Sequence, residues 1–185
     1  LNTSVALYRT DKDNNNQRVN AKPHPYWEPL NQSSRGLDAE ISGSLTDRWQ
    51  VYAGYTFNRS TNRNSVGDNV ESRQKGYNFS SHTPKHMFRL YTSYVLPVDD
   101  GKWTVGLGLK SSSKTANSSS SLKQGGYTIW NTNVQYRPSK NLQLGLAVNN
   151  LTDKRYYENQ YSRAANSGSF YGEPRNAVFS LKWKM

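Results

Sequence analysis

The sequence has 185 residues, a formal net charge of +11 and a hydrophobic fraction of 34%. Its mean hydropathy is −0.93, and no apolar run approaches the roughly 18 residues of a membrane-spanning helix, which excludes a helical membrane protein. The absence of cysteine excludes disulfide bonds and thiolate metal sites, whereas thirteen tyrosines and five tryptophans favour an all-β protein.

Alternation of apolar and polar residues predicts eight β-strands along the chain. In WQVYAGYTFN, Trp49, Val51 and the next odd positions are apolar or aromatic, and most of the even positions are polar or glycine. WTVGLGLK and LQLGLAVNN repeat the same pattern. The predicted strands are residues 3–10, 37–45, 49–58, 88–96, 103–110, 129–137, 142–150 and 177–185. Each is expected to have one apolar face and one polar face.

The connections between these strands alternate in length. Short connections are expected at Thr46–Arg48, Val98–Lys102 and Pro138–Asn141. Long ones are expected at about Asp11–Ser34, Thr61–Lys85, Thr115–Gly125 and Thr152–Arg175. The short turns and the long loops therefore lie at opposite ends of the strands.

This arrangement is typical of a transmembrane antiparallel β-barrel. Aromatic residues gather at both ends of the apolar face: Trp49, Trp103 and Trp183 near the short turns, and Phe57 and Trp130 toward the long loops. Such rings of aromatic side chains mark the two membrane interfaces. A soluble sandwich also alternates, but it gives no reason for long loops at one end only. Every backbone polar group in hydrocarbon must be paired, so the sheet is expected to close into a barrel.

Several stretches resemble the TonB-dependent outer-membrane receptors, particularly the ferric-siderophore branch. They are VNNLTDKRYYENQYS (Val148–Ser162), FYGEPRN (Phe170–Asn176), SSHTPKHMFRLYTSYVLP (Ser80–Pro97) and the longer run Gln124–Tyr157. The resemblance implies the last eight strands of a plugged barrel of about 22 strands. The first residues, LNTSVALYRT, have neither an initiator methionine nor a signal peptide. Residues 1–185 are therefore expected to be the C-terminal portion of the barrel, with the N-terminal plug domain absent.

The resemblance also implies a function and partners. A receptor of this branch sits in the bacterial cell outer membrane, captures a ferric siderophore outside and releases it inward when the TonB complex acts on the plug. The TonB complex is expected to contact the missing N-terminal region. Outer-membrane lipid and lipopolysaccharide are the expected surroundings. The chelator supplies the iron ligands, so the protein needs neither a cofactor nor a metal site of its own.

Aromatic and cationic residues occur together in the long loops and are the candidates for ligand binding. Aromatic faces and basic donors suit a bulky, polar chelate, through stacking and charge-assisted hydrogen bonds. The candidates are Tyr26, Trp27, Tyr77, Tyr161, Arg163 and Tyr171. The alternative for each one, favoured by the frequency of aromatic belts in such proteins, is packing at the membrane interface or in a loop, with basic residues touching lipopolysaccharide.

Two further motifs have a structural interpretation. His82 and His86 are spaced as metal ligands on a helix would be, but Pro84 lies between them in a strand entry, so no metal site is predicted. YGEPRN is interpreted as a turn, with Gly172 and Pro174 shaping the backbone. Neither a Gly-x-Ser-x-Gly elbow nor a Walker loop is present, and no enzyme is predicted.

Two alternatives remain. The first is a small structural or porin-like outer-membrane barrel without specific siderophore binding. The second is a soluble basic β-protein that binds nucleic acid, suggested only by the net charge of +11. It predicts stacking aromatics and basic residues on one sheet face, whereas here the aromatics lie opposite the polar face and the basic residues are spread over the loops. No nucleic-acid partner is therefore expected.

Overall fold

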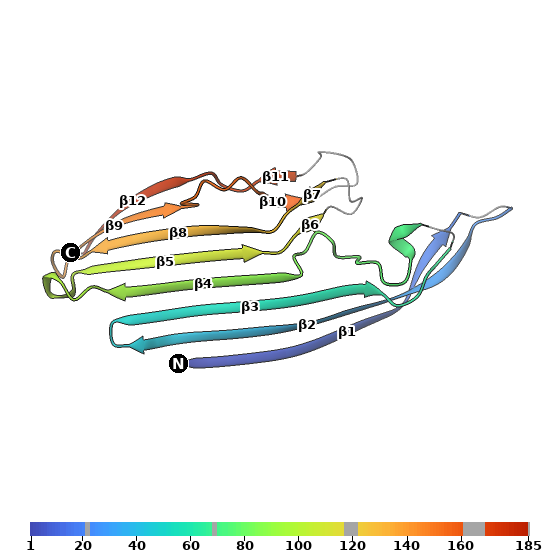
Figure 1. The fold of residues 1–185 in the computed structure, drawn as a ribbon, viewed down its shortest axis with the longest axis horizontal. Helices are drawn as coiled ribbons and strands as arrows, with labels where there is room; N and C mark the ends of the chain where they lie inside the picture. The colour runs from blue at the N-terminus through green and yellow to red at the C-terminus, as the bar shows by residue number, and fades with distance from the viewer. Residues whose placement is uncertain (21–22, 68–69, 117–121, 161–168, 185) are drawn as a thin grey trace.

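The computed structural model describes residues 1–20, 23–67, 70–116, 122–160 and 169–184, and they form one antiparallel sheet with small additions at one end (Figure 1). The sheet has eight strands in the order β1-β2-β3-β4-β5-β8-β9-β12. Their bounds are β1 Asn2–Val19, β2 Tyr26–Thr46, β3 Trp49–Asn62, β4 His86–Val95, β5 Trp103–Ser112, β8 Tyr127–Tyr136, β9 Leu142–Asn149 and β12 Asn176–Trp183. Consecutive strands of the sheet are neighbours throughout, as in an up-and-down barrel wall.

The register between strands confirms the two predicted faces. Ala53 lies opposite Leu90, and Leu90 lies opposite Leu109. One residue further along each strand, Gly54 lies opposite Arg89 and Arg89 opposite Lys110. Opposed residues project to the same side of a sheet, so the first row belongs to the apolar face and the second to the polar face. A slip of one residue would exchange the two faces completely.

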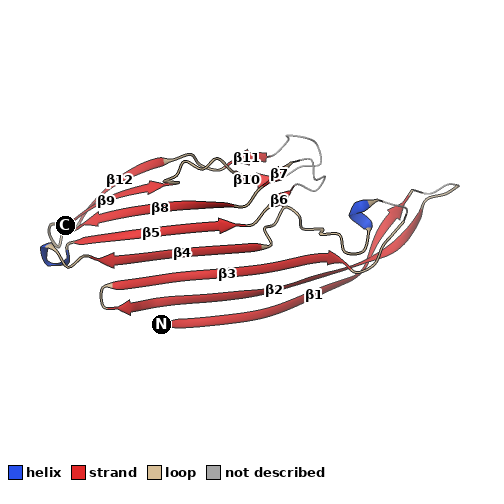
Figure 2. Cartoon of the chain, in the orientation of Figure 1, coloured by secondary structure: helices blue, strands red, loops and turns tan. Residues whose placement is uncertain are grey.

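The short turns and both termini lie at the same end of the sheet (Figure 1). A two-residue turn joins β2 to β3, the 3₁₀ turn η2 (Asp99–Gly101) lies between β4 and β5, and residues 137–141 join β8 to β9. Figure 2 shows that strands dominate and that only two short helical turns, η1 and η2, are present in the described part of the chain. None of the described helices is long and apolar enough to cross a membrane.

The prediction of a loop between Asp11 and Ser34 is wrong, because most of this segment is β-strand. β1 continues to Val19 and β2 begins at Tyr26, and their pairing passes a bulge between Lys12 and Asn15. Residues 11–18 are polar on both faces, and in β2 the aromatic residues Tyr26 and Trp27 are adjacent, so neither stretch has an alternating pattern, although their main chains still pair. The result is a hairpin that extends beyond the rest of the sheet (Figure 1).

The connection from β3 to β4 folds against this hairpin. Val66 is buried against Val19 and Leu30, the largest buried apolar group in the described residues. The Glu28 carboxylate accepts a 2.7 Å hydrogen bond from the Gly67 N–H. The 3₁₀ turn η1 (Glu71–Arg73) follows, and the Asn62 N–H donates to the Tyr77 carbonyl. The loop therefore packs against the hairpin and supports it.

The other two long connections each contain a short paired ladder. β6 (Thr115–Ala116) pairs with β7 (Lys123–Gln124), and β10 (Tyr157–Gln160) pairs with β11 (Ser169–Tyr171). Both ladders lie at the end of the sheet opposite the short turns (Figure 1). Structure at this end is therefore more extensive than the sequence pattern indicated.

The apolar face is largely exposed. Val5, Leu7, Phe179 and Leu181 are each more than 60% accessible, although they would be core residues in a soluble sandwich. The sheet is antiparallel and all-β, as predicted. In the described residues β1 and β12 each have only one neighbouring strand, so the sheet is not closed within this chain.

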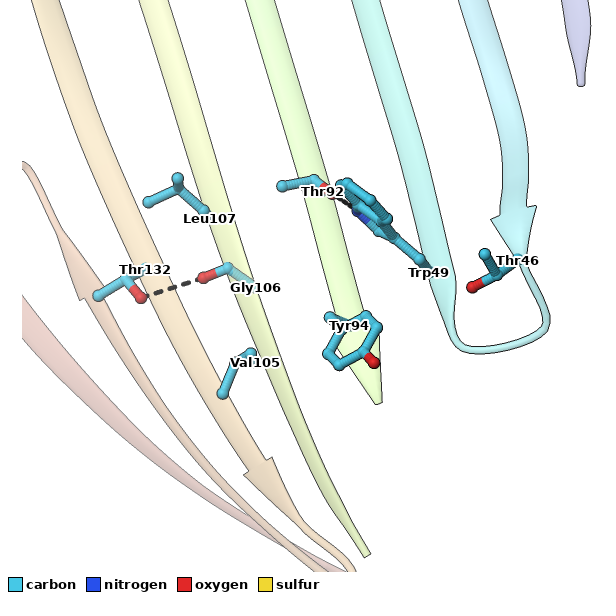
Figure 3. A pocket seen from close by; sticks show the side chains of 8 residues that line it. All are labelled: Thr46, Trp49, Thr92, Tyr94, Val105, Gly106, Leu107 and Thr132. Carbon is cyan, nitrogen blue, oxygen red and sulfur yellow. Dashed lines mark hydrogen bonds between the residues drawn. The ribbon is translucent and has the colours of Figure 1, made fainter. Parts of the chain in front are cut away.

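Aromatic residues at the short-turn end contact one another across strands. Trp103 and Tyr136 stack with centroids 4.3 Å apart, and Trp49 meets Tyr94 edge-on at 6.4 Å. The Trp49 Nε1–H donates to the Thr92 hydroxyl at 2.7 Å. Figure 3 shows Trp49, Thr92 and Tyr94 among the residues that line a groove of about 700 Å³ on the apolar face. This arrangement is the belt of aromatic side chains expected at a membrane interface, because indole and phenol groups have one apolar and one polar end.

Candidate ligand-binding site

Two stacked tyrosine pairs and one arginine lie at the end of the sheet that carries the long loops, and together they are called the tyrosine cluster. Its members are Tyr127, Arg155, Tyr156, Tyr157 and Tyr171. The Tyr127 and Tyr156 rings stack at 4.7 Å, and those of Tyr157 and Tyr171 at 4.5 Å. The Arg155 guanidinium carbon lies 4.2 Å from the Tyr171 ring centre. Stacked phenol rings beside a cation suit a planar, electron-rich ligand.

The phenol groups of this cluster have shifted acidities. Burial, followed by the nearby Glu158 carboxylate, raises the pKa of Tyr156 to about 12. The Tyr157 and Tyr171 hydroxyls are 3.1 Å apart, and this hydrogen bond raises the pKa of Tyr157 and lowers the pKa of Tyr171. The Arg155 charge adds to the lowering at Tyr171. Tyr171 is also half exposed, so the more acidic phenol of the pair is accessible to a ligand.

A basic recess adjoins the tyrosine cluster. It has a volume of about 650 Å³, and Lys85, Lys114 and Lys123 are among its lining residues. Gln124 connects the two features, since its side chain accepts from the Tyr157 N–H at 2.5 Å and donates to the Tyr157 carbonyl at 3.2 Å. In the described part of the chain the three lysines take part in no ion pair. This lysine recess therefore offers positive charge beside aromatic surface.

Asn150 holds the backbone that positions the cluster. Its side chain is 2% exposed and makes three hydrogen bonds. The amide donates to the carbonyls of Lys154 at 2.9 Å and Glu173 at 3.0 Å, and the amide oxygen accepts from the Lys154 N–H at 2.8 Å. Its φ of 48° is left-handed, a region that asparagine tolerates better than most residues. Asn150 thus ties the end of β9 to both arms of the loop that carries the tyrosines.

The YGEPRN segment has a structural role, although Gly172 does not have the positive φ of a glycine turn. The Arg175 backbone N–H, and not its guanidinium, donates to the Asp153 carboxylate at 2.9 Å. The Asn176 amide donates to Glu173 and to the Pro174 carbonyl. These bonds close the loop as it re-enters the sheet at β12.

Gly172 allows one of the tyrosine stacks to form. A Cβ atom at this position would meet the Tyr156 ring, and the Gly172 N–H already donates to the Tyr156 carbonyl at 2.9 Å. We expect Gly172→Ala to loosen the loop because overpacking costs about 1–3 kcal/mol. Trypsin should then cleave the folded protein after Lys154 or Arg155 about ten-fold faster. Gly125→Ala is the control, since a Cβ there contacts nothing within 4 Å. Equal cleavage of both variants would contradict this role.

The candidates chosen from the sequence lie in different parts of the fold. Tyr26 and Trp27 begin β2 at the tip of the extended hairpin, where Trp27 is 66% exposed. Tyr77 lies in the loop after β3. Only Tyr171 belongs to the tyrosine cluster, and Tyr161 and Arg163 lie outside the described residues. Of the described candidates, Tyr171 is thus separate along the fold from Tyr26, Trp27 and Tyr77.

Tyr127 is a member that the sequence analysis did not select. It lies opposite Ser112 on the polar face of the sheet. The sequence did offer a signal for this residue, namely an aromatic side chain at a position of the polar face. Tyr156, Tyr157 and Arg155 were near Tyr161 in the sequence, but their stacking partners come from other strands.

The histidine pair forms no shared site. His86 begins β4, where its Nδ1 lies 2.7 Å from the Tyr55 hydroxyl and its ring lies 5.1 Å from that of Phe57. His82 lies in the preceding connection. Among the described residues, no group of three or more potential ligands is placed to hold a metal ion.

Comparison with known protein families identifies the fold. Residues 1–151 match the family described as TonB dependent receptor-like, beta-barrel. The chain belongs to this family of TonB-dependent receptors. Such receptors are β-barrels of the outer membrane, which confirms the predicted fold class and localisation. Family membership also argues against the soluble nucleic-acid-binding alternative.

Individual TonB-dependent receptors match nearly the whole chain. PiuA, a probable siderophore receptor of Acinetobacter baumannii, is 32% identical over 100% of this chain. The ferripyoverdine receptor of Pseudomonas aeruginosa is 31% identical over 99%, and its structure with bound pyoverdine superposes with a TM-score of 0.77 over 99% of the chain at 28% identity. The ferric-catecholate receptor Fiu of Escherichia coli gives a TM-score of 0.76 over 98% at 26% identity. These relatives are transport receptors and not enzymes.

The chain spans only part of these receptors. It corresponds to 24% of PiuA, 23% of the ferripyoverdine receptor and 25% of the Fiu structure. The shared region is therefore one portion of a longer barrel protein in each relative.

Proposed function

We propose that this chain is the C-terminal portion of a TonB-dependent outer-membrane receptor that takes up a ferric siderophore. The observation that carries the proposal is the similarity of almost the entire chain to receptors named for siderophores of different chemistry, pyoverdine and catecholate. The exposed apolar face supports a membrane-embedded sheet. The clustered tyrosines and lysines at the loop end support a site for a large polar ligand.

Two groups of residues at the loop end are proposed to contact the ligand. The tyrosine cluster, with Tyr171 accessible, and the lysine recess provide stacking surface and positive charge for a chelate. Tyr26, Trp27, Tyr77, Tyr161 and Arg163 remain proposed contacts from the hairpin tip and the other loops. The siderophore carries the iron with its own ligands, so iron is cargo and the protein needs no cofactor.

The remainder of the receptor is part of the same proposal. The eight strands would be the last of a plugged barrel of about 22 strands, with β1 and β12 pairing with strands outside this sequence. The plug and the segment that contacts the TonB complex would precede Leu1. Outer-membrane lipid and lipopolysaccharide would surround the apolar face.

Growth under iron limitation tests this function. A strain lacking the full-length receptor should lose growth on one ferric siderophore among hydroxamate, catecholate and mixed-type chelates, and the receptor gene should restore it only when TonB is present. A porin-like barrel would instead admit small solutes without TonB and without preference for a chelate. Restoration of growth in the absence of TonB would contradict the proposal.

A further inference from the structure

Three arginines face one another across β1, β2 and β3. Arg9 lies opposite Arg35, and Arg35 lies opposite Arg59. All three side chains are exposed. Opposed residues on neighbouring strands have Cβ atoms about 4.5–5.5 Å apart, so like charges in this arrangement destabilise a sheet. A row of three cations is therefore costly unless an anion lies against it.

This arginine row marks the end of the apolar face. Two residues from each arginine toward the short-turn end, on the same side of the sheet, are Leu7, Leu37 and Phe57, which are themselves opposite one another. On the polar face at the same level, Tyr8 lies opposite Gly36, and a Cβ on Gly36 would meet the Tyr8 ring. The arginines therefore project away from the polar face that would line the barrel interior.

The row lines a recess that contains further basic residues. The recess has a volume of about 410 Å³, and Arg63 and Lys75 also line it. The ion pairs near it are those of Asp11 with Arg9 at 2.9 Å and with Arg63 at 3.7 Å, and that of Asp13 with Arg63 at 2.9 Å. In the described part of the chain, Arg35, Arg59 and Lys75 are in no ion pair. Five cations thus face two carboxylates.

We propose that the arginine row binds the phosphate groups of a phosphorylated glycolipid in the outer leaflet. Guanidinium groups bind phosphate oxygens in bidentate pairs. The apolar residues directly below would contact the acyl chains of the same molecule. This continuity of basic and apolar surface fits a lipid better than a soluble anion. The inference rests on the proposed outer-membrane location but concerns the outside of the barrel, away from the siderophore site.

Native mass spectrometry of the full-length receptor with added bis-phosphorylated lipid A tests the site. We expect Arg35→Gln/Arg59→Gln to weaken retention of lipid A about 30-fold, because each basic residue near an anionic surface contributes about 1 kcal/mol and two such contributions convert to about that factor. Arg35→Lys/Arg59→Lys should lose less, because it keeps the charge but not the bidentate geometry. Arg137→Gln/Lys140→Gln, at the opposite end of the sheet, is the matched control and should retain lipid A fully.

Three results would overturn the inference: unchanged retention by Arg35→Gln/Arg59→Gln, equal binding of dephosphorylated lipid A, or displacement of lipid A by millimolar inorganic phosphate, which would indicate a site for free anions. Folding of each variant is checked in SDS gels, in which a folded, unheated barrel migrates differently from the same protein after heating. Siderophore-dependent growth should be kept in the arginine variant. Its failure in the unaltered receptor would count against the proposed function and not against the lipid site.

Discussion

Asn150→Ala is expected to open the loop that carries the tyrosine cluster. The substitution removes three hydrogen bonds from a side chain that is 2% exposed, and it leaves the Lys154 N–H without its partner. Each unsatisfied buried group costs about 1–3 kcal/mol, so we expect the free energy of loop opening to fall by about 2–4 kcal/mol. Hydrogen exchange at the Lys154 and Arg175 amides should accelerate on the order of a hundred-fold or more.

Two control variants separate the causes of this effect. Asn150→Gly removes the same hydrogen bonds but tolerates the left-handed φ of 48°. Asn150→Asp keeps the acceptor for the Lys154 N–H and loses only the amide donor. If the hydrogen bonds dominate, the glycine variant should resemble alanine and the aspartate variant should be intermediate. Full recovery in Asn150→Gly would show that backbone conformation, and not hydrogen bonding, is the main contribution.

Leu107→Arg is expected to impair assembly of the barrel. Leu107 lies midway along the apolar positions of β5, opposite Thr92 and Thr132 on the same face. An arginine on the lipid face near the bilayer midplane costs about 2–4 kcal/mol. The full-length variant should show a lower denaturant midpoint in lipid vesicles and less folded protein in the outer membrane.

The neighbouring position provides a matched control. Gly108 lies on the polar face, and a Cβ there makes only ordinary contacts with Asn131. Gly108→Arg places the same charge one residue away, toward the side on which Lys110 and Arg89 are already opposed. It should change the denaturant midpoint much less. Equal loss in the two variants would contradict the assignment of the faces.

The loop end and the two faces of the sheet have separate roles in these proposals. The tyrosine cluster and the lysine recess are proposed to contact the siderophore, and the apolar face is proposed to contact the membrane. The arginine row lies where the apolar face ends. A substitution in one surface should therefore leave the others intact. This separation is what allows siderophore uptake and lipid retention to be measured as independent properties of one receptor.

Strand positions and faces were predictable because the two sides of this sheet differ chemically. Between Trp49 and Phe57, and between Trp103 and Leu109, every second residue is apolar, and such a pattern fits only one register. The short turns at 46–48 and 98–102 were equally clear, since they separate two patterned strands. The eight-stranded antiparallel order then follows from the turn lengths.

The extended hairpin and the arginine row were not predictable in this way. Residues 11–18 are polar on both faces and residues 26–34 place their few apolar side chains without a period of two, so the strands continue without an alternating signal. Main-chain pairing and the packing of Val66 against Val19 hold this part together. Arg9, Arg35 and Arg59 are far apart in the sequence, and only the register brings them into one row.

The sequence by itself determined which residues face lipid and in what order the strands run, because hydrocarbon and an aqueous interior impose opposite demands on alternate residues. Tertiary structure alone decided what lies beyond the apolar band. There both faces meet water, no pattern is imposed, and contacts between distant segments select the conformation. The tyrosine cluster illustrates this, since Tyr127 stacks on Tyr156, and Tyr171 on Tyr157, only after separate parts of the chain are paired.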